Sequence, residues 1–174
     1  MSGVITTEDD LYLGGLKKSG KIKQFSLEEF RQVAENGFVS FSCSDGDTDI
    51  DIILRKMTHR PHSVRNFGLP LLLVPLYGLH YDRKLARHYV RSAKLGMDGK
   101  QTKNLLLIFH APCLMATTYG HSIEKQIFEF APGIMELFCK DQFFNPALIY
   151  LFFHVMRITK KEGTFKQGIY QIIP

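Results

Sequence analysis

The sequence of 174 residues has no tryptophan, few cysteines and no apolar run long enough to span a membrane. Its three cysteines, Cys43, Cys113 and Cys139, are odd in number and widely separated, which argues against a disulfide framework and favours a reducing compartment. The most apolar stretch, residues 68–81, has only 14 residues and is interrupted by two prolines. We therefore expect a protein that is soluble or attached peripherally to a membrane.

The N-terminal region carries neither of two common targeting signals. Residues 1–10 are polar and acidic, unlike a secretory signal peptide, and the second residue is Ser where myristoylation requires Gly. Residues 1–24 offer few side chains for burial, so the entropic cost of ordering them would be hard to offset. We predict a flexible tail over residues 1–24 and a single domain over residues 25–174. The tail ends in four lysines: Lys17, Lys18, Lys21 and Lys23.

Familiar catalytic and metal-binding motifs are also missing, including G-x-S-x-G and H-E-x-x-H. Residues 15–21 read G-x-x-x-x-G-K, but Ile22 stands where a phosphate-binding loop needs a hydroxyl for Mg²⁺. A glycine-rich basic tail is the better interpretation. His110, Cys113 and His121 could be imagined as zinc ligands, but their spacing matches no familiar pairing and no fourth ligand is evident. We expect a binding protein rather than an enzyme, with no metal and no cofactor.

What the sequence does have is a concentrated positive charge. Residues 55–103 contain eleven Lys and Arg against two acids, a net charge of +9 that exceeds the +5 of the whole chain. Residues 25–54 hold seven acids and one Arg and sum to −6. A concentrated cationic surface attracts polyanions such as nucleic acid, nucleocapsid or anionic lipid.

Residues 83–95 predict an amphipathic helix inside this basic segment. Five apolar residues from Leu85 to Ala93 fall within one arc of roughly 140°, and Asp82 suits the N-cap. The opposite arc carries only positive charge, from Arg83, Lys84, Arg87, Arg91 and Lys94. Such a face is either an ordinary solvated surface or a binding site for phosphate or anionic lipid. We predict a binding site, with the four lysines of the tail as a second basic surface.

Hydrophobic periodicity predicts the other elements. Ser26 and Glu29 form a capping box, which indicates a helix over residues 27–36. Alternating residues around Asp45-Gly46 predict an antiparallel hairpin of residues 39–43 and 50–54. We further predict a basic loop over residues 57–67 and a buried strand over residues 105–109. Residues 113–119 should be extended and residues 132–138 should form a short helix. A terminal hairpin should follow, made of residues 149–158 and 164–173. Residues 123–130 are ambiguous.

The apolar stretch 68–81 allows two interpretations. It can belong to the core, which is the default for so apolar a segment. If it is exposed, it is a site of self-association or membrane contact, because large apolar patches rarely stay in water. This second interpretation assigns self-association to Leu71, Leu72, Leu73, Val74, Leu76 and Tyr77.

Three segments, in this order, resemble the matrix proteins of rhabdoviruses. They are GMDGK (96–100) leading into the strand NLLLIF, FAPGIMELF (130–138), and residues 147–173 with their Lys-Lys turn. The resemblance follows the element order over residues 37–174 and is readable residue by residue over 96–173. The chain lacks the Pro-Pro-x-Tyr budding motif of many animal members and is shorter than they are, which indicates a plant- or arthropod-associated branch.

The resemblance implies an α+β fold: an antiparallel sheet of about five strands with two to four packed helices. It also implies a structural protein of the virion that self-assembles, condenses the nucleocapsid and links it to the inner face of the envelope. The implied partners are the viral nucleocapsid (nucleoprotein–RNA), the anionic inner-leaflet membrane, the viral glycoprotein and further copies of the chain. The alternative is a nucleic-acid-binding viral regulator, such as a silencing suppressor or movement protein.

Overall fold

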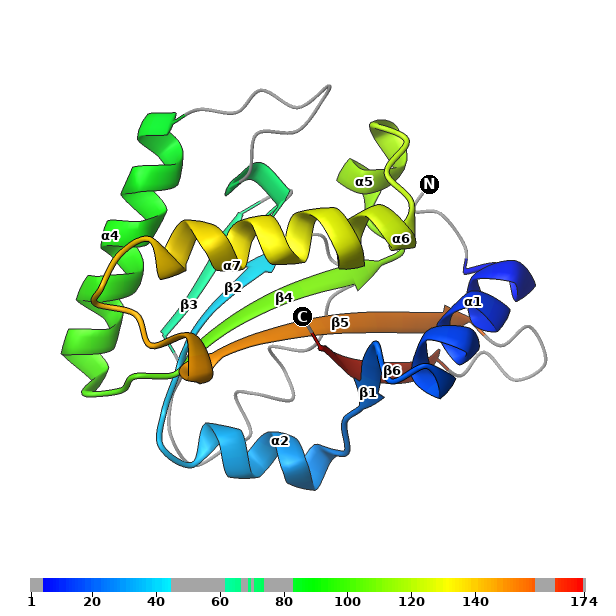
Figure 1. The fold of residues 1–174 in the computed structure, drawn as a ribbon, viewed down its shortest axis with the longest axis horizontal. Helices are drawn as coiled ribbons and strands as arrows, with labels where there is room; N and C mark the ends of the chain where they lie inside the picture. The colour runs from blue at the N-terminus through cyan, green and yellow to red at the C-terminus, as the bar shows by residue number, and fades with distance from the viewer. Residues whose placement is uncertain are drawn as a thin grey trace.

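The computed structural model describes residues 5–44, 62–66, 69, 71–73, 83–158 and 165–173, which form a mixed sheet with helices on both faces (Figure 1). The six strands lie in the order β1-β6-β5-β4-β2-β3. Neighbours from β5 to β3 are parallel, whereas β6 and β1 are antiparallel additions. The strands are β1 (Ile22–Gln24), β2 (Val39–Cys43), β3 (His62–Asn66), β4 (Leu105–Ala111), β5 (Ile149–Ile158) and β6 (Phe165–Ile172).

The mixture of helices and strands agrees with the predicted class, but the predicted antiparallel sheet is wrong. Helical connections cause the difference: α4 (Arg83–Lys100) joins β3 to β4, and α5 (Leu114–Thr118), α6 (Ile123–Lys125) and α7 (Ala131–Cys139) lie between β4 and β5. Such crossovers return the chain to the same end of the sheet, so the strands they join run parallel. β4 is buried along all seven residues, as expected for a parallel strand covered on both faces.

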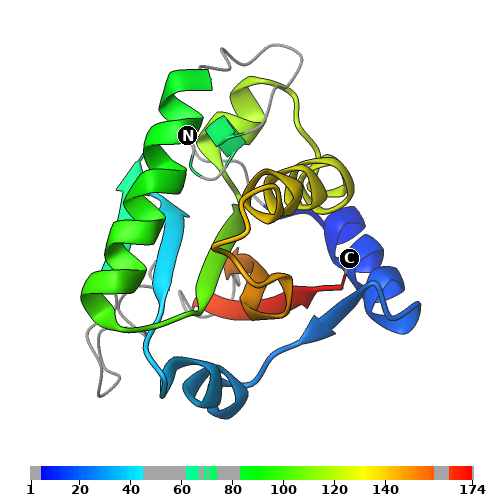
Figure 2. The same ribbon diagram turned by 60° about the vertical axis from the view of Figure 1, so that its left-hand side comes forward.

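Alternate residues of β4 face two separate parts of the core. Leu105 and Leu107 belong to the larger cluster, which contains apolar side chains of α4 and α7. Leu106 and Ile108 belong to the smaller cluster, which contains Phe30 of α2 (Leu27–Ala34). Figure 2 shows the sheet between α2 on one side and α4 and α7 on the other. None of the helices within the described ranges is both long and apolar enough to cross a membrane.

The prediction of a flexible tail over residues 1–24 is wrong for residues 5–24, which the structure describes. Helix α1 (Thr7–Lys18) begins with a capping box between Thr6 and Asp9, and β1 extends the sheet by pairing with β6. Leu13, Leu16 and Ile22 are buried in the larger core cluster. Burial of these side chains and pairing of β1 offset the ordering cost that composition alone suggested was too high.

The phosphate-loop-like stretch of residues 15–21 is the C-terminal cap of α1. The backbone N–H of Lys21 donates to the carbonyl of Leu16 (3.0 Å), and that of Gly20 donates to Lys17 (3.2 Å). Gly20 has a φ of 73°, so this is the Schellman arrangement in which glycine ends a helix. Because these N–H groups bond to α1, they do not form a cradle for phosphate.

The three predicted helices are confirmed. Helix α2 has the predicted capping box, since Ser26 N–H donates to Glu29 (2.9 Å) and Glu29 N–H donates to Ser26 (3.1 Å). Helix α4 buries Ala86, Tyr89 and Ala93 as predicted, but it continues to Lys100. The third is the helix after Pro132, and the buried β4 and the pairing of β5 with β6 are also confirmed.

Three local predictions need correction. Strand β2 has a parallel partner on each side, β3 and β4, so it has no free edge for the antiparallel partner that was predicted. The second strand of the predicted hairpin, residues 50–54, lies outside the described part. The basic loop of residues 57–67 contains β3. Residues 113–119, predicted as extended, contain α5, and the ambiguous residues 123–130 form α6 and a π-helical turn (Gln126–Phe130). Short 3-10 helices lie at Leu71–Leu73 and Pro146–Leu148.

Candidate anion-binding groove

A groove of about 840 Å³ lies between α4 and the C-terminal end of α7. Five cations and one acid line it, which gives the lining a net charge of +4. The lining residues are Arg83, Ala86, Arg87, Val90, Arg91 and Lys94 from α4, and Leu137, Lys140, Asp141 and Gln142 from α7 and the turn after it. This surface, called the groove below, contains four of the five cations predicted on this helix.

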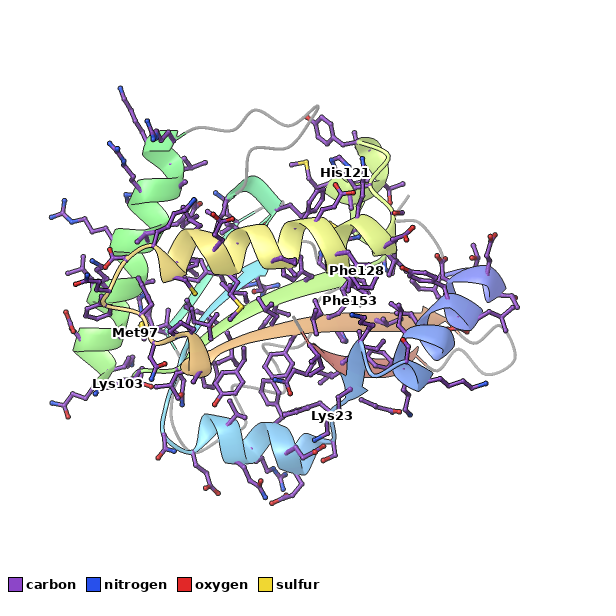
Figure 3. The ribbon with its side chains drawn as sticks, in the orientation of Figure 1. Lys23, Met97, Lys103, His121, Phe128 and Phe153 are labelled. Carbon is purple, nitrogen blue, oxygen red and sulfur yellow. The ribbon has the colours of Figure 1, made fainter. Side chains whose placement is uncertain are left out.

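Three arginines form a row along one wall of the groove. Arg83, Arg87 and Arg91 recur every four residues, so they lie one above the other on α4, about 6 Å apart along its axis. All three are exposed, and none forms an ion pair with an acid in the described part of the chain. Figure 3 shows side chains with nitrogen at their tips projecting from α4 away from the sheet.

Lys94 differs from the arginines because it is bonded across the groove. Its ammonium lies 2.5 Å from a carboxylate oxygen of Asp141 and 5.3 Å from the ring centroid of Phe143. The hydrogen bond from Lys94, followed by one from the Phe143 N–H, lowers the pKa of Asp141 below its ordinary value. Lys94 therefore holds α4 against the turn after α7.

One further cation lines the groove, and another lies beside it on α4. Lys140 pairs with Glu136 of α7 at 2.8 Å, but both side chains are exposed, so the ion pair adds little stability. A bound phosphate can therefore displace Glu136 from Lys140 at little cost. Lys84 is exposed on α4 but does not line the groove.

The lysines predicted in the tail form a separate surface at the other end of the sheet. Helix α1 lies far from α4 in both views (Figures 1 and 2). Lys17 donates to Gln24 (2.6 Å), while Lys18 and Lys21 are exposed. Lys23 pairs with Glu29 (2.7 Å), and together with bonds from Ser26 it lowers the pKa of Glu29 to about 2. The predicted basic residues therefore form two patches, one on α4 and one near α1. In the patch near α1, the charge of Lys23 is already neutralised by Glu29.

The predicted self-association residues are not an exposed patch where the structure describes them. Leu71 and Leu73 are buried in the larger core cluster, beside Leu69, so the self-association assignment is wrong for these two residues. The physical reason is the short 3-10 helix of Leu71–Leu73, which lies against α4 and lets its leucines join the core. The side chain of Leu72 and the residues Val74, Leu76 and Tyr77 lie outside the described part.

A second cluster contains groups that could bind a metal. A thiol from Cys43, a ring nitrogen of His110 and a thiol from Cys113 lie within 4.8 Å of one another, and all three residues are buried. The zinc grouping considered from the sequence included His110 and Cys113 but paired them with His121, which packs edge-on against Phe130 instead. Cys43 was missed because it is 67 positions before His110. Cys43 lies at the end of β2, and β2 is the parallel neighbour of β4. A correct prediction of this pairing would have placed Cys43 near His110.

Comparison with known proteins finds no family model that matches this chain and no curated protein that is detectably similar to it.

Proposed function

We propose that the protein binds the phosphate groups of a polyanion in the groove, and that it does so as a viral matrix protein that links nucleocapsid to membrane. The observation that carries the proposal is the row of Arg83, Arg87 and Arg91, which has no acidic partners in the described part of the chain. Guanidinium groups bind phosphate in a bidentate manner, and a row of them suits a ligand with repeated phosphates.

The position of these cations also supports a binding role. Arg83 and Lys84 lie in the first turn of α4, at the positive end of the helix dipole, and this turn contains no acid. Cations there destabilise a helix, because acids are the favourable residues at that end. A role in folding stability alone does not account for this arrangement, whereas a role in anion binding does.

The floor of the groove narrows the choice of ligand. Ala86, Val90 and Leu137 are apolar, so the groove offers charge at its rim and an apolar base. This combination suits a ligand with phosphates beside apolar faces, such as RNA bases or lipid chains. The matrix assignment within this proposal comes from the sequence resemblance; the parallel centre of the sheet departs from the antiparallel sheet that the resemblance implies.

Vesicle flotation tests the proposal with two variants that each lose three positive charges. The groove variant is Arg83→Gln, Arg87→Gln, Arg91→Gln, and the tail variant is Lys17→Gln, Lys18→Gln, Lys21→Gln. We expect the groove variant to lose most of its binding to phosphatidylserine vesicles and the tail variant to keep most of it. Equal losses in the two variants would show that overall charge, and not the groove, determines binding.

A parallel titration with single-stranded RNA separates the two phosphate sources. If the three arginines contact phosphates, the groove variant should reduce the slope of log affinity against log salt by roughly 2. Binding to both RNA and anionic vesicles, together with salt-dependent assembly in electron micrographs, supports the matrix role. RNA binding without vesicle binding or assembly favours the nucleic-acid-binding regulator.

A further inference from the structure

Cys43, His110 and Cys113 form a compact set of buried ligands that the groove does not involve. Their exposed fractions are 1%, 3% and 3%, and their ligand atoms lie within 4.8 Å of one another. Two sulfurs and a nitrogen around a tetrahedral zinc ion lie about 3.6–3.8 Å apart, so a shift of roughly 1 Å would complete the geometry. The three residues come from the end of β2, the end of β4 and the turn before α5.

The histidine and the two thiols of this cluster differ in how they are bonded. Nε2 of His110 is buried and has no hydrogen-bond partner among the residues that the structure describes. The thiol of Cys113 is hydrogen-bonded to that of Cys43 and to the backbone N–H groups of Met115 and Ala116. A buried imidazole nitrogen is normally satisfied, and two adjacent buried thiols share only weak hydrogen bonds. A cation that accepts electron pairs from all three groups resolves both features.

We propose that Cys43, His110 and Cys113 bind one zinc ion, which joins the ends of β2 and β4 to the start of α5. Two thiolates and a neutral imidazole suit zinc, and the two negative charges balance the charge of the ion, so the buried site is neutral. Binding releases the two thiol protons to solvent. Three protein ligands leave a fourth position for water, and a cavity of about 140 Å³ partly lined by Cys113 has room for it.

Cobalt titration of the reduced, metal-free full chain tests this site. We expect uptake of one Co²⁺ per chain, with thiolate-to-cobalt charge-transfer absorption and the visible bands of a four-coordinate ion, and we expect Zn²⁺ to displace it. Cys43→Ser and Cys113→Ser should abolish the charge-transfer signal or weaken binding more than tenfold, and His110→Gln should weaken it more than tenfold. Cys139→Ser is the matched control, because this third cysteine lies on α7 outside the cluster, and it should leave the spectrum unchanged.

Two further measurements keep the test decisive if a variant fails to fold. The wild-type chain should gain thermal stability with Zn²⁺ but not with Mg²⁺, and the Cys139→Ser chain should gain as much. Wild-type protein that takes up no cobalt after reduction would overturn the proposal, as would a spectrum that survives loss of both Cys43 and Cys113. A Cys43–Cys113 disulfide in the isolated protein, with no metal uptake after its reduction, would overturn it as well.

Discussion

Lys94 of α4 and Asp141 after α7 form an ion pair of 2.5 Å that bridges the groove. Asp141 also accepts a hydrogen bond from the N–H of Phe143 (3.1 Å), whose ring lies beside the Lys94 ammonium. Lys94 thus serves a different purpose from the arginines on the same helix, although the sequence assigns all of them to one basic face.

Replacing Asp141 should therefore strengthen anion binding. In Asp141→Asn the Lys94 ammonium is released, and a lysine close to anionic lipid contributes on the order of 1 kcal/mol, which corresponds to roughly fivefold tighter binding. Vesicle binding at several salt concentrations measures the change, and the salt dependence should become steeper. Gln142→Ala, also in the lining but without a charge, serves as the control. Weaker binding by Asp141→Asn would contradict this prediction. It would mean that the Lys94–Asp141 ion pair maintains the shape that the groove needs for binding.

Glu29 should titrate far below the ordinary value for a glutamate. Lys23 and Ser26 lower its pKa in the fold to about 2, from an ordinary value of 4.5. A lowered carboxylate pKa stabilises the fold fully above the ordinary value, and this contribution is lost as pH falls from about 4.5 towards 2. NMR titration should show Lys23→Ala raising the pKa of Glu29, while Lys18→Ala leaves it in place. A Glu29 that titrates near 4.5 in the wild-type chain would rule out the ion pair in solution.

Gly96 should tolerate no side chain. A Cβ placed on it would lie 2.5 Å from Cδ2 of His62 on β3, whereas a Cβ on Gly99 of the same helix meets nothing within 4 Å. We expect Gly96→Ala to lower the free energy of unfolding by about 1–3 kcal/mol, despite the better helix propensity of alanine. Gly99→Ala should instead raise it by up to about 1 kcal/mol. Urea denaturation measures both; equal effects would show that α4 does not pack closely on β3.

Leu73 should behave as a core residue. It is fully buried, so Leu73→Ala should lower the free energy of unfolding by about 2–5 kcal/mol. Leu95→Ala, at a position on α4 whose side chain is 63% exposed, should change it by less than about 0.5 kcal/mol. Denaturation and sedimentation of both variants distinguish the two interpretations of residues 68–81. If Leu73→Ala reduces self-association and leaves stability unchanged, the leucine belongs to an interface.

Much of the fold follows from local sequence signals. The capping box at Ser26, the apolar arc of α4 and the uninterrupted apolar run of β4 each correspond to an element in the structure. These signals are readable because helix and strand periodicity and N-capping involve residues close together in the chain. The row of Arg83, Arg87 and Arg91 on one helix face was predictable for the same reason.

The direction of the strands and the partners of the site residues depended on contacts between distant segments. Leu13, Leu16 and Ile22 look too sparse to order a tail, yet they join a core that includes residues more than a hundred positions away. The opposite wall of the groove comes from α7, and Cys43 meets His110 only because β2 and β4 run parallel. A charge pattern or residue spacing predicts a face of one element; which face lies opposite is set by the packing of the whole sheet, because burial rewards the arrangement that covers the most apolar surface.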